Sequence, residues 1–310
     1  MAVSTNEAPA AERVTLRTIL VATDGTPKAH VALDAAADLA KRSGASLHLM
    51  NAFHVAPAAV YGYSTYIGPE DVSEAFAWEA RTLLGAEEAR VEAQGVAVSG
   101  KYAEQGPIFD AVTEVAAAVD ADLIVVGNRE LSGLKGLLVG SASAHVLHNA
   151  HRPVLIVRGG PGCWPPAHVI VGFDRSEASE RAAGIAAAIA RLYDGATLTL
   201  VEVVPAEGSA GSAASGPANG LEDEHARLEV DRTRLEAASG QPMIGTVAVG
   251  DPADALLART EGRAGPHLIA VGTRGFGPVR RLLLGSVSTR ILHAGHTSLL
   301  VVPPVKRMAE

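Results

Sequence analysis

One segment of this sequence has the residue types and the spacing of a phosphate-binding loop. It reads Gly272-Thr273-Arg274-Gly275, then nine residues, then Gly285-Ser286, and it lies between an apolar run and a helical pattern. Glycines let a backbone approach phosphate oxygens without obstruction by a Cβ atom. Serine hydroxyls and the free amides of a helix's first turn both bind anions. The spacing therefore favours a phosphate site after residue 272.

Positive charge in the same segment strengthens this interpretation, because Arg274, Arg280 and Arg281 all lie in or beside the loop. A second interpretation is a tight strand-to-helix turn in which Ser286 only caps the helix. The residues of the loop leave both interpretations open.

The layout around this loop occurs twice in the chain. Residues 17–158 and 167–304 each begin with an apolar run that ends in aspartate, Asp24 or Asp174, and each contains a late glycine loop. The two loops start at Gly127 and Gly272, which are 145 positions apart (272 − 127). That period has the length of a whole domain and is far longer than a solenoid unit.

Each copy alternates apolar strands with alanine-rich helical patterns, which predicts right-handed βαβ units and a parallel sheet covered by helices on both faces. We expect strands near residues 17–23, 46–53, 96–102, 122–127 and 153–157, and again near 168–173, 196–204, 243–249, 267–272 and 298–302. We expect helices over 27–43, 70–94, 107–120, 141–150, 177–193, 221–239, 252–264 and 286–294. The fold class is α/β, with two tandem Rossmann-like domains.

Composition indicates where the domains begin and end. Residues 1–14 resemble a flexible tail, 15–158 form the first domain, 159–166 a Gly/Pro-rich linker and 167–305 the second domain. The low-complexity segment 206–220 is expected to be a loop without fixed structure, and residues 55–69 to be a surface loop.

Bulk properties exclude several classes of protein. A net charge of −8 disfavours nonspecific binding to nucleic acid or to an anionic membrane. No apolar run approaches the ~20 residues of a membrane span. The first residues lack a basic and an apolar region, so we expect no secretion signal. The single cysteine, Cys163, suits a reducing compartment. These features predict a cytoplasmic protein.

Several motifs in each copy resemble those of the universal stress protein family. The pattern Gly272-x2-Gly275-x9-Gly285-Ser286 is similar to the family's nucleotide-binding signature. Residues 171–174, 250–252 and 298–302 resemble its first-strand Asp turn, its turn before the penultimate helix and its closing strand. The first copy shows the same order, so the resemblance covers nearly the whole chain.

The resemblance implies an open five-stranded parallel sheet in each domain, with ATP at the carboxyl edge. It implies that Asp174, and Asp24 in the first copy, contact the adenosine, and that Val203 and Ala52 line the adenine pocket. It implies that ribose and phosphates are held by Gly272, Arg274, Gly275, Gly285, Ser286, Val287 and Ser288. It also implies that the closing strands, Val154 to Val157 and Leu299 to Val302, pair the two domains edge to edge.

The first copy departs from the signature at one position. It reads Gly127-Asn128-Arg129-Glu130, nine residues, then Gly140-Ser141-Ala142-Ser143, so Glu130 replaces the second glycine. The corresponding ligand positions are Gly127, Arg129, Gly140, Ser141, Ala142 and Ser143. A carboxylate beside phosphates repels them, so this site should bind ATP more weakly or need Mg²⁺.

The second copy departs elsewhere, because Arg175 stands where the first copy has Gly25. A turn with positive φ would strain Arg175 by about 1 kcal/mol. Alternatively, its side chain reaches the nucleotide.

The histidines of residues 145–151 have helical spacing, but without a carboxylate or cysteine beside them we expect no metal site. The predicted function is ATP-dependent regulation in a stress response by a non-enzymatic module, with internal domain pairing and a possible homodimer. Slow ATP hydrolysis and a nucleotide-free dimeric scaffold are the alternatives.

Overall fold

The structure is a computed structural model, and it describes residues 13–54, 69–127, 151–206, 217–273, 286–294 and 297–304. The first domain contains β1 (Thr18–Ala22), α1 (Pro27–Ser43), β2 (Ser46–Phe53), α3 (Pro69–Glu92), β3 (Val98–Gln105), α4 (Ile108–Ala118), β4 (Leu123–Gly127) and β5 (Val154–Val157). The second contains β6 (His168–Gly172), α6 (Glu177–Ala190), β7 (Thr197–Val204), α7 (Pro217–Ser239), β8 (Ile244–Val249), α8 (Pro252–Ala258), β9 (His267–Gly272), α9 (Ser286–Ala294) and β10 (Ser298–Val302).

All ten of these strands form a single sheet, in the order β3-β2-β1-β4-β5-β10-β9-β6-β7-β8. Neighbouring strands within each domain are parallel. At the centre β5 and β10 are antiparallel, with Leu155 opposite Leu300. The predicted α/β class, the two five-stranded parallel sheets and the pairing of the closing strands are confirmed. The pairing satisfies two strand edges that would otherwise be open.

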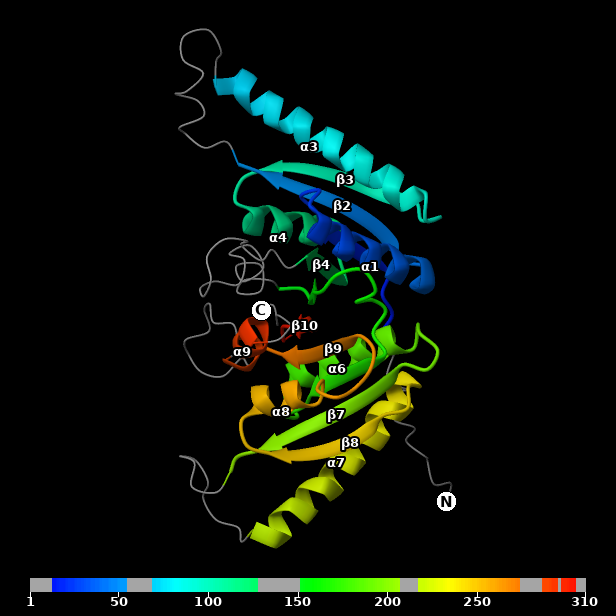
Figure 1. The fold of residues 1–310 in the computed structure, drawn as a ribbon, viewed down its shortest axis with the longest axis vertical. Helices are drawn as coiled ribbons and strands as arrows, with labels where there is room; N and C mark the ends of the chain where they lie inside the picture. The colour runs from blue at the N-terminus through cyan, green and yellow to red at the C-terminus, as the bar shows by residue number, and fades with distance from the viewer. Residues whose placement is uncertain are drawn as a thin grey trace, which may run out of the picture.

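Helices cover both faces of the sheet (Figure 1). One hydrophobic core contains side chains of α1, α3, α6 and α7 packed on one face of the strands. The other core contains side chains of α4, α8 and α9 on the opposite face. Because both faces are buried, the inner strands are continuous runs of Val, Ile, Leu and Ala, as expected for a parallel sheet.

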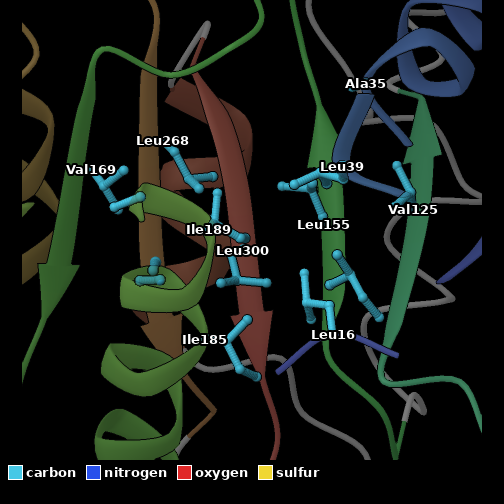
Figure 2. Close-up of a cluster of buried hydrophobic side chains, with 14 of the residues drawn as sticks. Leu16, Ala35, Leu39, Val125, Leu155, Val169, Ile185, Ile189, Leu268 and Leu300 are labelled. Carbon is cyan, nitrogen blue, oxygen red and sulfur yellow. The ribbon is translucent and has the colours of Figure 1, made fainter. Parts of the chain in front are cut away.

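The core is continuous across the boundary between the domains. Figure 2 shows Leu155 of β5 and Leu300 of β10 on adjacent strands, with Leu39 of α1 on one side and Ile189 of α6 on the other. All four side chains are fully buried. Burial of each such side chain contributes about 1.5–3 kcal/mol, so the two domains stabilise each other through apolar packing.

Polar contacts beside this core join α1 to the end of α6. The Tyr193 hydroxyl donates to Asp38 Oδ2 at 2.7 Å, and the Trp164 indole donates to the Tyr193 oxygen at 2.9 Å. The Arg42 guanidinium lies 4.8 Å from the Tyr193 ring centre and pairs with Asp38. Burial raises the pKa of Tyr193, and the bond to Asp38 raises it further. The linker residue Trp164 thus takes part in the interface.

The N-terminal segment also reaches the second domain. Arg191 at the end of α6 donates to the Val14 carbonyl at 3.4 Å, and a Cβ atom added at Gly184 would lie 3.0 Å from Val14 Cγ2. Val14, the last residue of the predicted tail, therefore packs on α6.

Some helix limits differ from the sequence-based expectation. Helix α7 begins at Pro217, inside the segment expected to lack structure, so that prediction is wrong for its last four residues. Proline suits the first turn of a helix, where its missing N–H leaves no bond unmade. Helix α8 ends at Ala258 and not near residue 264, because the next amides bond three residues back and Gly262 takes a φ of 69°.

Two neighbouring histidines, the first residues of β6 and β9, are expected to make the stability of the second domain depend on pH. The rings of His168 and His267 lie 5.0 Å apart, and the buried His267 Nε2 has no hydrogen-bond partner among the described residues. Burial, and then the charge of His168, lower the pKa of His267. The unfolded chain therefore binds a proton at His267 more readily than the folded protein does. As a result, the free energy of unfolding decreases as the pH falls below about 6.5, and above that pH His267 causes no such decrease.

We expect His267→Gln to reduce the loss of stability between pH 8 and pH 5.5. Urea unfolding at both values measures it, and the pH 8 difference between the variant and the parent protein controls for altered packing. An unchanged pH dependence in the variant would contradict this assignment.

Candidate nucleotide-binding site

A cleft opens at the carboxyl ends of β6, β7 and β9 in the second domain, where open α/β sheets bind ligands. Its volume is ≈ 580 Å³, including the part open to solvent. Its lining comes from three strands, from the first turns of α6 and α9, from the first two turns of α8, and from the turn after β6. The lining residues are Gly172, Phe173, Asp174, Ser179, Val201, Val203, Pro252, Leu256, Val271, Gly272, Ser286, Val287 and Ser288.

One wall of the cleft is apolar. Val201 and Val203 lie two residues apart on β7 and therefore share a face of the sheet. Leu256 of α8 and Val271 of β9 line the same cleft. A planar apolar ring system is the kind of ligand that such a wall accepts. The predicted position of Val203 beside the ligand fits this arrangement.

Asp174 is fixed in the cleft by hydrogen bonds to the start of α6. Its Oδ1 accepts from the Ser176 amide at 3.1 Å and from the Ser176 hydroxyl at 2.5 Å. Ser176 caps α6 by accepting from the Ser179 amide at 3.2 Å. The Asp174 amide in turn donates to Ser179 Oγ at 3.3 Å. These bonds hold the carboxylate in one orientation before any ligand arrives.

The side chain of Arg175 goes to an acidic cluster on the opposite face of β7. Its guanidinium pairs with Glu202, Glu224 and Asp231. Glu202 lies between Val201 and Val203, so it points away from the cleft. Burial raises the pKa of Glu202, and the Arg175 charge opposes that rise.

The backbone of Arg175 is left-handed, with φ of 60° against 72° at Gly25. This is the turn with positive φ that the comparison of the two copies gave as one alternative. Of the two sequence-based alternatives, the strained turn is the correct one.

Gly272 ends β9 where α6 begins to pack on the sheet. A Cβ atom at this position would lie 2.6 Å from Ala178 C and from Ser179 N. At the equivalent Gly127 it would lie 2.9 Å from the Lys28 carbonyl oxygen of α1. Both glycines are therefore required for close packing of a helix against a strand end, a role that is independent of any ligand.

The N-terminal turn of α9 forms the third side of the cleft. Ser286 is exposed, Val287 half-buried, and Ser288 only 1% exposed. The helix starts at Ser286 as predicted. Arg290, one turn later, pairs with Asp251 and Asp254 at the start of α8 at 2.9 and 2.8 Å. A helix N-terminus carries a positive partial charge, so this side of the cleft suits an anion.

The structure thus brings Asp174, Val203, Gly272, Ser286, Val287 and Ser288 together around one cleft. In the first domain Asp24, Ala52 and Gly127 lie at the ends of β1, β2 and β4, the corresponding sheet edge. Asp24 Oδ1 accepts from the Thr26 amide and hydroxyl, which repeats the Asp174 turn. The remaining predicted residues lie outside the described residues: Arg274, Gly275, Gly285, Arg129, Gly140, Ser141, Ala142 and Ser143.

Sequence reasoning missed several cleft residues, among them Ser179, Val201 and Leu256. Two-residue periodicity from Val203 would have found Val201. Comparison of the copies conceals Ser179, because Ala29 occupies the corresponding position in the first domain, whereas the counterpart of Leu256 is the apolar Val112.

In the parts of the chain that the structure describes, no three or more His, Cys, Asp or Glu side chains gather as a metal site would require. Over the same residues, no helix combines the length and apolar character needed to cross a lipid bilayer.

Comparison with known proteins places this geometry in a family. The universal stress protein YxiE of Bacillus subtilis is 38% identical over 149 residues, covering 45% of this chain and 97% of that protein. A universal stress protein of Mycobacterium tuberculosis is 27% identical over 311 residues, covering 91% and 94%. The crystal structure of a universal stress protein from Archaeoglobus fulgidus matches the fold with a TM-score of 0.68 at 20% identity, covering 92% and 98%. The sequence profile of the universal stress protein family matches residues 15–158 and 167–303, so this chain belongs to that family, with two copies of its domain in tandem.

Proposed function

We propose that the second domain binds ATP in the cleft beside Asp174, and that the occupied cleft regulates a stress response through conformation or partner choice. The observation that carries this proposal is the convergence of an apolar wall, a fixed carboxylate and a helix N-terminus on one cleft of ≈ 580 Å³.

The chemistry of the lining fits the parts of ATP. Val201, Val203 and Leu256 would pack on adenine, and the Asp174 carboxylate would accept from a hydroxyl of the adenosine. Ser286, Ser288 and the amides of the α9 first turn would donate to phosphate oxygens. The sequence signature supports the same role for Arg274, Gly275 and Gly285.

The first domain should bind ATP more weakly. Glu130 replaces a signature glycine, and its carboxylate would repel phosphates unless Mg²⁺ lies between them. The wall residues also differ, because Met50 and Val112 stand where the second domain has Val201 and Leu256. The two sites of one chain are therefore proposed to be unequal.

We propose a binding role and not a catalytic one. Among the described residues that line the cleft, Asp174 is the one ionisable side chain. Its Oδ1 already accepts two hydrogen bonds from Ser176. Efficient phosphoryl transfer relies on several charged groups that stabilise the transition state, and the arginines of the loop, Arg274, Arg280 and Arg281, lie outside the described residues. Slow hydrolysis of a bound ATP is the second candidate.

Calorimetric titration of the parent protein and of Asp174→Asn tests the proposal. We expect two unequal binding events with ATP. Asp174→Asn keeps an oxygen that accepts from Ser176 but loses the charge, so the tighter event should weaken roughly 10-fold to 100-fold. The matched control is Asp24→Asn, which should weaken the other event and leave the tighter one unchanged.

Chromatography of the nucleotide recovered after titration shows whether ATP stays intact. Two equally tight events would contradict the inequality of the sites. Saturating ATP without any heat or retained nucleotide would overturn the proposed function and favour the scaffold.

A further inference from the structure

A buried arginine of the first domain contacts a helix that borders the cleft of the second domain. Arg158 directly follows β5 and is 8% exposed. Its Nη2 donates to the Leu292 carbonyl of α9 at 2.7 Å, and its backbone amide donates to Ser298 Oγ of β10 at 3.2 Å. The antiparallel pairing of β5 with β10 brings the end of one domain's sheet to α9 of the other.

This contact lies one helical turn from the proposed ligand site. Leu292 follows Ser288 by four residues, so its amide bonds to the Ser288 carbonyl in a regular helix. Ser288 lines the cleft, and Leu292 is fully buried. A nine-residue helix moves as a unit, so a shift at Leu292 displaces the turn that holds Ser286 and Ser288.

The ion pairs of Arg290 also attach α9, but they are more exposed. Arg290 reaches Asp251 and Asp254, but its side chain is 50% exposed and theirs are 45% and 60% exposed. Ion pairs at such positions contribute little, because water screens them. A buried charged donor contributes more, since its loss also leaves the buried carbonyl without that partner. Arg158 is therefore a stronger polar constraint on α9 than the ion pairs of Arg290.

The residue at the equivalent position of the second domain cannot make the same contact. Val157 pairs with Gly127, and Val302 pairs with Gly272, so the position after Val302 corresponds to Arg158. That position is Pro303, which has no side-chain donor. The first domain can thus constrain the cleft of the second through the Arg158 side chain, and Pro303 offers no such side chain in return.

We infer that Arg158 is a positioning residue through which the first domain sets the geometry of the nucleotide cleft in the second. The expected effect of Arg158 on ATP affinity depends on the proposed function. The expected effect of Arg158 on the local opening of α9 does not depend on that function. A purely structural arginine would lower global stability without changing either the affinity for ATP or the local opening of α9.

The test uses the full chain carrying Arg158→Met, which keeps the aliphatic stem and removes the donors. We expect the tighter ATP event to weaken roughly 3-fold to 30-fold. We also expect the amides of α9 to exchange faster in hydrogen-exchange mass spectrometry without ATP, at a denaturant concentration where the chain stays folded. Arg158→Lys, which retains a charged donor, should restore part of both effects.

Arg191→Met is the matched control, because Arg191 also donates to a carbonyl at a helix end, that of Ser239 in α7, at 2.6 Å. It should lower the urea midpoint without changing ATP affinity or α9 exchange. Equal exchange of α9 in the parent protein and in Arg158→Met would overturn the inference, whatever happens to stability. If the parent protein binds no ATP, the proposed function fails, while the exchange of α9 still decides whether Arg158 positions the helix.

Discussion

Replacement of Gly275 by glutamate is expected to weaken ATP binding in the second domain by nearly three orders of magnitude. Two unit charges ~4 Å apart at an effective dielectric constant of ~20 repel each other by about 4 kcal/mol. Gly275 is the second glycine of the signature, and the substitution recreates the first domain's sequence there. Calorimetric titration of the tighter event measures the loss.

Two further variants separate local repulsion from a general effect of charge. Gly85→Glu adds the same charge on α3 of the first domain, where a new Cβ meets no atom within 4 Å, and should leave the tighter event unchanged. Glu130→Gly should strengthen the weaker event. An unchanged affinity in Gly275→Glu would remove the signature loop from the proposed site.

Gly272→Ala should destabilise the second domain by about 3 kcal/mol, because the new methyl group would overlap backbone atoms of α6 that cannot rotate away. The Cβ position lies 2.6 Å from Ala178 C and Ser179 N. Helix α6 would have to move away from β9, and the Asp174 turn, which is bonded to Ser176 and Ser179, would move with it. Chemical denaturation measures the loss of stability.

Gly85→Ala is the control for this prediction. It makes the same substitution inside a helix with open space around the new methyl group, and alanine there should stabilise the protein by about 0.5–1 kcal/mol. A Gly272→Ala protein as stable as its parent would show that α6 accommodates the methyl group.

The positions of the strands were predictable from the sequence. A strand that is buried on both faces needs a continuous run of Val, Ile and Leu, and such runs are easy to recognise. Residues 267–272 and 298–302 are strands within the predicted limits. The start of α7 was not predictable from composition, since Pro217 lies in a run of Gly, Ser and Ala that is typical of linkers. The end of α8 depended on a left-handed glycine, Gly262, within an otherwise helical pattern.

Site residues that belong to short local sequence patterns were predictable, whereas those that reach the cleft only through tertiary packing were not. Asp174 and Ser286 lie at a strand end and at a helix start, and both positions can be read from short patterns. Ser179 and Leu256 come from the sides of other helices and meet the cleft only through packing. Arg158 was hidden for the same reason, because its partner Leu292 is 134 residues away in the chain.

The antiparallel contact between β5 and β10 gives the molecule an approximate twofold axis within a single polypeptide. Two separate copies of one domain, paired in this way, would dissociate on dilution, whereas covalent linkage keeps the effective concentration near the millimolar range. In a symmetric homodimer every substitution appears on both sides of the axis. Here Arg158 and Arg175 each occur in one half only, because Pro303 and Gly25 stand at the equivalent positions of the other half. Fusion therefore permits a division of labour in which one half senses a ligand while the other half supports it.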